Sequence, residues 1–194
     1  MELLLKRAQK GDEEAFIEAI DIIMPQMYKV AKARLKNEED IGDAVQEAIL
    51  AAFSNLKKLK EPRYFKTWIM KILMNKCNDI IRKNKIVYVE DYEQVPSQHT
   101  MNEKIEQKLD FESILSHLSA EYRLVIVLFY VNKFTTKEIS EILSEKEGTI
   151  KSRLSRARQR LKTFDITSFD EVGDLKVILK DENGKDIEIN LKKE

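Results

Sequence analysis

Residues 135–161 read TTKEISEILSEKEGTIKSRLSRARQRL, and this stretch predicts two short helices with almost no connecting chain. Thr135 and Glu138 have the spacing of a capping box, in which two side chains satisfy the free amides at a helix start. Ser144 and Glu147 repeat that spacing and predict the start of the second helix. Two helices joined in this way indicate a helix-turn-helix, and the basic second helix predicts binding to duplex DNA.

The second helix is amphipathic when it is wound at about 3.6 residues per turn. The stripe expected to be buried comprises Ile150, Leu154, Ala157 and Leu161. The opposite face holds small and hydrogen-bonding residues: Gly148, Thr149, Ser152, Ser155, Arg156 and Gln159. Cations flank both edges, at Lys151, Arg153, Arg158 and Arg160. Charge alone favours an ordinary solvated helix, but the paired capping boxes and the preceding short helix favour a helix that enters the major groove.

The composition is typical of a helical protein that contains a real hydrophobic core. The chain has 194 residues, of which 43% are hydrophobic and 35% charged, with five Gly and three Pro. The single cysteine, Cys77, excludes an internal disulfide and fits a reducing cytoplasm. The N-terminus runs straight into a helical pattern, without the pattern of a signal segment, and the longest apolar run, 124–131, is too short to span a bilayer. We therefore expect a cytoplasmic protein.

The net charge is zero, but charge is unevenly distributed along the chain. Residues 55–85 hold ten Lys and Arg against two Asp and Glu, and residues 145–162 hold seven against two. Residues 86–121 hold two basic against eight acidic residues, and residues 165–194 hold five against nine. Two basic zones on one chain suggest two contacts with one polyanion.

Residues 2–84 show four successive amphipathic patterns and predict a helical bundle. Gly11 and Asp12 begin the first pattern, and Pro25 fits the first turn of the second. The third pattern covers about 38–56, with Ile49 and Phe53 among the residues expected to face inward. Pro62 introduces the fourth, which contains Trp68 among apolar neighbours, so core packing is favoured over base stacking for this side chain.

The helical pattern is interrupted over residues 85–103. Residues 85–90 read as a short strand or extended chain, and residues 96–100 read as linker. Helical spacing then resumes and continues through 122–131, a β-branched stretch whose helical neighbours favour a buried helix over a strand. With the helix-turn-helix it forms a second, smaller helical domain, and the fold class is all-α.

The last part of the chain has a different character. Residues 175–180 and 186–191 alternate in polarity around Asn183-Gly184, which is the pattern of a β-hairpin. An isolated hairpin is marginal in water, so this one either pairs with something else or is disordered alone. We expect four parts: 1–84, a linker over 85–103, a helix-turn-helix domain over 104–163 and a tail over 164–194.

These residues resemble the extracytoplasmic-function (ECF) sigma factors of bacterial RNA polymerase, over residues 2 to about 163. The opening 4–16, LLKRAQKGDEEAF, is similar to the opening usual in that family. The segment 43–48, DAVQEA, resembles its polymerase-binding helix, and 65–83 resembles its promoter-melting helix. The segment 148–158, GTIKSRLSRAR, matches its recognition helix nearly letter for letter. The tail beyond Phe164 belongs to no standard part of the family.

The resemblance implies that the first domain contacts polymerase and the minus-ten promoter element. Asp43, Gln46 and Glu47 would dock on the coiled coil of the polymerase β′ subunit, although without the resemblance they read as a solvated polar face. The basic loop 57–64 would capture a flipped base of the non-template strand, offsetting the cost of unstacking it. The residues implied in minus-ten binding are Lys57, Lys58, Lys60, Arg63, Tyr64, Lys66, Asn75, Lys76, Asn78 and Arg82.

The resemblance also implies that the second domain reads the minus-thirty-five element. Arg156 and Ser152 are expected to contact base edges, because Arg pairs bidentately with guanine. Phosphate contacts are expected from Lys137, Lys146, Lys151 and Arg158, with the helix N-terminus contributing backbone amides. The other residues placed at this element are Gly148, Thr149 and Ser155.

The implied function is promoter-specific transcription initiation, regulated in stress responses. The implied partners are core RNA polymerase, through its β′ and β subunits, promoter DNA, and an anti-sigma factor that is often membrane-anchored. Two other interpretations stay open: a helix-turn-helix regulator that needs no polymerase, and an adaptor that sequesters a regulator through its tail. Neither His99 nor His117 joins a cluster with metal-ligand spacing, and no Gly-rich phosphate loop is present. We therefore expect no enzyme activity, no cofactor and no metal.

Overall fold

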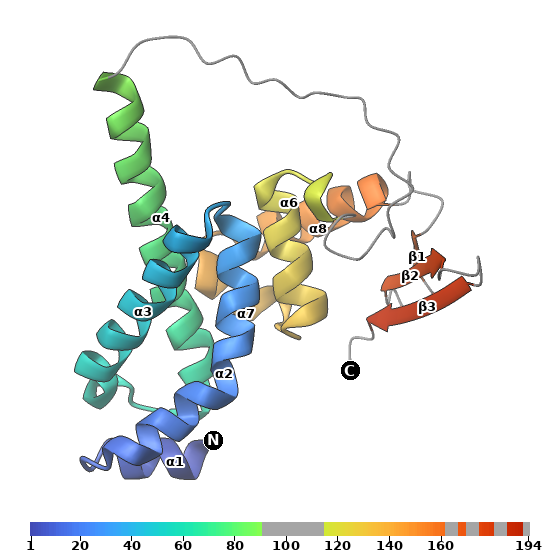
Figure 1. The fold of residues 1–194 in the computed structure, drawn as a ribbon. Coiled ribbons are helices and arrows are strands. Elements are labelled where there is room, and N and C mark those ends of the chain that lie inside the picture. Colours follow the sequence, from blue (N-terminus) through green and yellow to red (C-terminus); the bar gives the residue numbers. More distant parts are fainter. Residues whose placement is uncertain (91–114, 162–166, 170–174, 181–185, 192–194) are drawn as a thin grey trace.

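The computed structural model describes residues 1–90, 115–161, 167–169, 175–180 and 186–191. Figure 1 shows two groups of helices packed side by side, together with a small antiparallel sheet. The all-α prediction is confirmed for the body of the protein, and its two helical groups match the two predicted helical domains. Residues 91–103 of the predicted linker and the helical pattern over 104–114 lie outside the described residues.

Four helices and two short 3₁₀ turns make up the first helical domain. They are α1 (Glu2–Ala8), α2 (Glu13–Arg34), α3 (Glu38–Asn55), η1 (Leu56–Lys58), η2 (Pro62–Tyr64) and α4 (Phe65–Glu90). Gly11, with φ of 101°, allows the tight turn between α1 and α2. The Asp12 side chain then accepts a hydrogen bond from the Ala15 amide at 3.0 Å and caps α2.

Two boundaries predicted for this domain are wrong. Pro25 does not begin a new helix but lies inside the continuous helix α2. Both Pro25 and Asp21, whose carbonyl loses its helical partner, are exposed, so water can satisfy that carbonyl. Residues 85–90 are the last turns of α4 rather than a strand. Their β-branched residues favour a strand only weakly, and the preceding helix propagates through them.

The second helical domain contains the predicted helix-turn-helix. Its elements are α6 (Ala120–Ile126), the π-helical turn η3 (Val127–Val131), α7 (Thr136–Leu143) and α8 (Glu147–Leu161). The apolar stretch 122–131 is helical, as predicted, and residues 124–130 are buried. All four residues of the α8 stripe, Ile150, Leu154, Ala157 and Leu161, are buried as well.

The predicted β-hairpin is confirmed at its expected bounds. Strands β2 (Leu175–Lys180) and β3 (Asp186–Leu191) pair antiparallel, with Leu175 opposite Leu191 and Lys180 opposite Asp186. A third strand, β1 (Thr167–Phe169), pairs with the other edge of β2 and was not predicted. The extra strand explains how the hairpin avoids the marginal stability of a lone pair of strands.

The two helical domains pack directly against one another. Helix α7 lies on α4, and α6 and η3 lie on α2. Buried residues from both domains form one hydrophobic cluster, which includes Met27, Leu73, Val125 and Ile142. The faces of α2 and α4 that meet the second domain are therefore partly covered by it.

Candidate nucleic-acid interface

The helix-turn-helix is held by a capping box at its first helix, as predicted. The Thr135 hydroxyl accepts from the Glu138 amide at 3.2 Å, and the Glu138 carboxylate accepts from the Thr135 amide at 2.8 Å. The second predicted capping box is wrong. Ser144 has φ of 55° and ends α7 in the left-handed conformation, so α8 begins only at Glu147. Lys146, not Ser144, is the residue that precedes α8.

Glu147 ties the two helices together instead. Its carboxylate accepts a hydrogen bond from the Thr136 hydroxyl at 2.7 Å and forms an ion pair with Lys151 at 2.9 Å. The Thr136 hydrogen bond, followed by Lys151, lowers the pKa of the Glu147 carboxyl below its usual value. The negative charge also lies at the helix N-terminus, where the helix dipole favours it. The hydrogen bond thus joins the first residue of α7 to the first residue of α8.

The outward face of α8 has the arrangement that the sequence predicts. Its exposed residues include Gly148, Thr149, Ser152, Ser155 and Arg156. These are short side chains beside one long cation, and such a surface leaves room for a helix to approach base edges. Three of the four cations predicted to bind phosphate, Lys137, Lys146 and Lys151, are also exposed.

Two of the arginines that flank the outward face of α8 make contacts within the protein. Arg153 donates to Glu145 at 2.8 Å and lies 3.8 Å from Glu121. Arg158 is half-buried and donates to the Tyr130 hydroxyl at 2.8 Å. Its guanidinium also lies 5.6 Å from the Tyr130 ring centroid. Arg153 and Arg158 therefore orient α8 on α6 and η3, a role that helical periodicity alone does not reveal.

The basic loop 57–64 presents its cations to solvent. Lys57, Lys58, Lys60, Arg63 and Tyr64 are all exposed, and Arg63 lies over the Tyr64 ring at 4.8 Å. Leu56 and Leu59 are buried and attach the loop to the domain. The two buried leucines thus hold the backbone of this basic loop against the domain.

Gln9, which sequence reasoning did not single out, anchors this loop. Its amide nitrogen donates to the Leu56 carbonyl at 3.1 Å and to the Leu59 carbonyl at 2.7 Å. Both carbonyls belong to the turn that carries Lys57 and Lys58. The contact spans about fifty positions in the chain, so no local pattern could have indicated it.

Side chains predicted to continue the minus-ten surface along α4 are largely paired. The Lys76 amine contacts Glu47 at 3.0 Å, and Arg82 contacts Asp79. The Asn78 carbonyl accepts from Arg34 at 3.0 Å. Lys66 donates to the Asn132 backbone carbonyl in the second domain at 2.8 Å, and burial lowers the pKa of its amine. Asn75 and Asn78 are exposed but line the pocket between the two domains.

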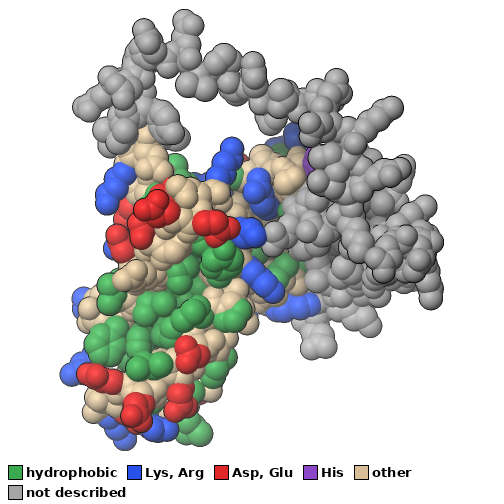
Figure 2. All heavy atoms as spheres, viewed as in Figure 1, with side chains coloured by type: hydrophobic (Ala, Val, Ile, Leu, Met, Phe, Trp, Pro, Cys, Tyr) green, Lys and Arg blue, Asp and Glu red, His purple; other side chains and the backbone are tan. Residues whose placement is uncertain are grey.

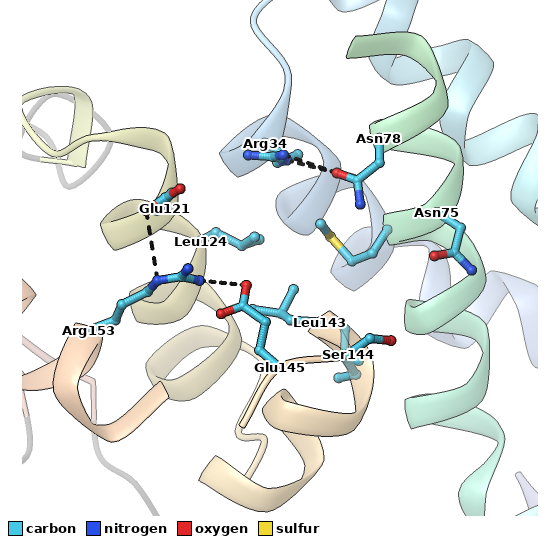
Figure 3. Close-up of a pocket in the computed structure, with 11 residues that line it drawn as sticks. Arg34, Asn75, Asn78, Glu121, Leu124, Leu143, Ser144, Glu145 and Arg153 are labelled. Carbon is cyan, nitrogen blue, oxygen red and sulfur yellow. Dashed lines mark hydrogen bonds and ion pairs between the residues drawn. The ribbon is translucent and has the colours of Figure 1, made fainter. Parts of the chain in front are cut away.

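That pocket is a polar gap between the domains (Figure 3). It is lined by Arg34, Asn75 and Asn78 from the first domain and by Ser144, Glu145 and Arg153 from the second. Its volume of about 190 Å³ lies below the roughly 300–1,000 Å³ usual for ligand pockets. We therefore treat it as part of the domain interface rather than as a ligand site.

The three residues predicted to bind polymerase, Asp43, Gln46 and Glu47, lie exposed on α3. Farther along the same helix, Leu50 is 60% exposed and Phe53 is 46% exposed. Phe53 was predicted to face inward, but its ring only contacts Phe16 at 5.1 Å between centroids and stays half in solvent. Figure 2 shows hydrophobic side chains gathered on this part of the molecule, bordered by acidic ones. The face is therefore mixed acidic and apolar.

Within the described residues, no group of three or more His, Cys, Asp or Glu is arranged to hold a metal ion. The helices described here include none with the length and apolar character needed to cross a membrane. Cys77 is buried, and burial raises the pKa of its thiol to about 12. Trp68 is only partly buried and packs against the core, 6.1 Å from the Phe65 ring.

Each of the two helical domains matches a known protein family. Residues 20–86 match the family described as Sigma-70 region 2, and residues 108–161 match Sigma-70, region 4. The ECF RNA polymerase sigma factor SigW of Bacillus subtilis is 31% identical over 173 residues, which are 81% of this chain and 92% of SigW. The RNA polymerase sigma factor SigV of the same organism is 33% identical over 130 residues, 67% of this chain and 78% of SigV.

Solved structures share the fold. The sigma factor RpoE of Bartonella quintana, solved with the anti-sigma factor NepR, superposes with a TM-score of 0.62 at 26% identity, over 76% of this chain and 94% of RpoE. CnrH, solved with the cytosolic domain of CnrY, has a TM-score of 0.61 at 22% identity, over 84% of this chain and 94% of CnrH. The sequence matches and the two-domain helical fold lead to one conclusion: this chain belongs to the family of ECF RNA polymerase sigma factors.

Proposed function

We propose that this chain binds core RNA polymerase and directs it to promoters by reading two DNA elements with its two helical domains. The observation that carries the proposal is the presence of two separate basic surfaces on one chain, the outward face of α8 and the loop 57–64. Each surface alone would bind weakly. When one surface is bound, joining them on one polypeptide holds the other at a high effective concentration near its own promoter element. Polymerase would set the spacing between the two surfaces.

In the second domain, Arg156 and Ser152 would read base edges of the minus-thirty-five element. Both are exposed on the side of α8 opposite its buried stripe. Lys137, Lys146 and Lys151 would hold phosphates, together with the backbone amides at Gly148 and Thr149. Arg158 would also contact phosphate, while it keeps its hydrogen bond to Tyr130.

In the first domain, the loop 57–64 would capture an extruded base of the minus-ten element. Its exposed cations would attract the displaced strand, and Tyr64, which is 53% exposed, offers a ring for stacking. The anchoring of the loop by Gln9 supports this role, because a preorganised site loses less entropy on binding.

The polymerase would dock on α3 through Asp43, Gln46 and Glu47. The exposed Leu50 and Phe53 on the same helix support docking there, because exposed apolar residues with a polar rim are typical of protein interfaces. The β′ coiled coil, with contributions from the β subunit, is the expected partner.

We also propose control by an anti-sigma factor. The supporting observation is the similarity to RpoE, whose structure was solved in complex with the anti-sigma factor NepR. Membrane anchoring of such a partner stays a prediction. Co-purification with an anti-sigma factor but never with polymerase would favour the adaptor interpretation instead.

Run-off transcription with core polymerase, with and without this protein, tests the proposal. Promoter-specific transcripts should appear only when the protein is present, over a panel of promoters. Asp43→Lys should reduce both polymerase binding and transcript, whereas Glu18→Lys, the same charge change at an exposed position of α2, should not. If no promoter in a broad panel responds while the protein alone binds specific DNA, a polymerase-independent regulator is the better description.

A further inference from the structure

The three-stranded sheet that follows the helical domains has one apolar face. Strand residues alternate between the two faces of a sheet, and residues paired across antiparallel strands share a face. Val177 pairs with Thr167 on β1 and with Ile189 on β3, so these three residues share one face. The same register adds five more apolar residues to it: Phe169, Leu175, Leu179, Ile187 and Leu191. Every residue of this face except Thr167 is therefore apolar.

The other face of the sheet is polar. The strand residues that share it are Ser168, Lys176, Ile178, Lys180, Asp186, Glu188 and Asn190. Lys180 lies directly opposite Asp186, and such pairs of opposite charge are typical of a face in contact with water. The sheet therefore needs a cover on one face only, because an amphipathic sheet must bury its apolar face against another layer.

The described helices do not supply that layer. Among the residues that the structure describes, the strands make extended backbone contact only with one another. Figure 1 shows the sheet beside the helices rather than among them. The large exposed hydrophobic residues of the described helices all lie within positions 1–64, in the first helical domain. The second helical domain, as far as it is described, thus offers no large apolar surface to the sheet.

The apolar residues exposed on the first domain alternate with carboxylates. On α2, Asp21 lies one turn from both Ile17 and Met24, and all three are exposed. On α3, the exposed Glu47 lies one turn from Leu50. An apolar sheet placed over these helices would take the carboxylates out of water, which costs free energy. A second copy of the apolar sheet face brings no charge, so it fits better than the chain's own helices.

We propose that the apolar faces of two such sheets pack together, so that two copies of this chain form a symmetric dimer. A two-fold axis brings the same patch of each copy into contact, which suits a face that is apolar throughout its width. Two sheets packed in this way lie about 10 Å apart, with their strands within about 30° of each other. Val177 occupies the middle of the central strand β2, so its two copies would lie near the axis. The pairing does not depend on the proposed function.

The face is small, so the pairing should be weak. A strand spacing of about 4.8 Å and a rise of about 3.3 Å per residue give it dimensions of roughly 14 Å by 20 Å. An area of a few hundred Å² equals the largest apolar patch of a typical monomer. It is less than the roughly 800 Å² per partner that stable complexes bury. We therefore expect a dissociation constant of about 10–100 µM.

Sedimentation velocity of the full chain tests the pairing. From about 1 to 300 µM protein, the sedimentation coefficient should rise from that of one chain to that of two. Val177→Lys places a charge in the middle of the apolar face and should weaken association by about tenfold or more. Ile178→Lys is the matched control, because it places the same charge at the next residue of β2 but on the polar face. This control should associate like the parent.

A spin label on the polar face reports on the dimer and on the sheet together. Asn190→Cys carries the label on β3, on the face away from the proposed contact, and the buried native Cys77 stays unlabelled. Two sheets about 10 Å apart with outward labels should give one defined distance of about 20–35 Å, which unlabelled chain dilutes away. In Val177→Lys the distance should vanish while the spectrum keeps the restricted motion of a label on an ordered strand.

The parent decides the outcome even where Val177→Lys also disorders the sheet. A parent that stays monomeric at about 300 µM, or that shows no defined label distance there, overturns the dimer. The occupant of the face would then be the chain's own helices if Val177→Lys lowers their stability in urea, and a different protein if it does not. A dimer that Ile178→Lys disrupts and Val177→Lys leaves intact would use the polar face, and this result also overturns the proposal.

Discussion

Arg158 donates a hydrogen bond to the hydroxyl of the fully buried Tyr130 at 2.8 Å. The guanidinium also lies 5.5 Å from the centroid of the Phe129 ring. The contact attaches α8 to the apolar interior of its domain. The guanidinium of Arg158 packs on the buried rings of Phe129 and Tyr130, and the outward face of α8 stays exposed. An arginine that the sequence places among the phosphate contacts therefore has a structural role as well.

Loss of the Arg158–Tyr130 contact should destabilise the protein. We expect Tyr130→Phe to lower the free energy of unfolding by about 1 kcal/mol, and Arg158→Ala by about 1–3 kcal/mol, because the latter also removes the contact with the rings. Urea unfolding of both variants and of the double variant measures the coupling. Additive losses would show that the hydrogen bond contributes nothing.

Arg156→Ala should affect DNA selectivity rather than stability. The side chain is exposed, and a bidentate contact with guanine is worth about 1–3 kcal/mol of discrimination. Activity should fall at promoters with the correct upstream element and change little at promoters with that element altered. Run-off transcription on matched promoter pairs gives the ratio.

Lys151→Ala provides the contrast. A phosphate contact carries no base information, so its loss should weaken binding to all sequences and reduce the slope of affinity against salt. Lys151 also pairs with Glu147, which makes the expected loss smaller than for a free lysine. If Lys151→Ala and Arg156→Ala lose discrimination equally, the proposed division between base and phosphate contacts is wrong.

Gln9→Ala should impair minus-ten function without altering upstream binding. The Leu59 carbonyl loses the Gln9 donor, and the Leu56 carbonyl keeps only its bond from the Leu59 amide, which should cost about 1–3 kcal/mol and loosen the basic loop. Permanganate footprinting should show less promoter opening, while affinity for an upstream duplex stays the same. Lys10→Ala, at an exposed neighbouring position, is the control. A parallel fall in both readouts would indicate general destabilisation instead.

Asp12 should make the first domain sensitive to acid. Its hydrogen bond from the Ala15 amide, followed by Arg7, lowers the pKa of the carboxyl from the usual 3.8. A lowered folded pKa means that the stabilisation is complete above the unfolded value and is lost as pH falls through the folded value. Asp12→Asn keeps the cap but does not titrate. The stability difference between the parent and this variant should therefore shrink as pH drops from about 5 toward 3, measured by urea unfolding.

Much of the second domain follows from local sequence. The buried stripe from Ile150 to Leu161 and the capping box at Thr135 depend on residues three or four positions apart, and helical geometry relates such residues directly. The hairpin of β2 and β3 was likewise predicted at its observed bounds, because alternation and an Asn-Gly turn are local signals.

Other features were decided only by tertiary structure. The left-handed conformation of Ser144, which keeps it from capping α8, went against the local capping pattern. The contacts of Gln9 with Leu59, Lys66 with Asn132 and Arg158 with Tyr130 join residues that are 50, 66 and 28 positions apart. Sequence by itself determined which residues could form helices and which were cationic. Folding determined which cations stay free for DNA, because a long side chain binds whichever partner the packed helices bring within reach.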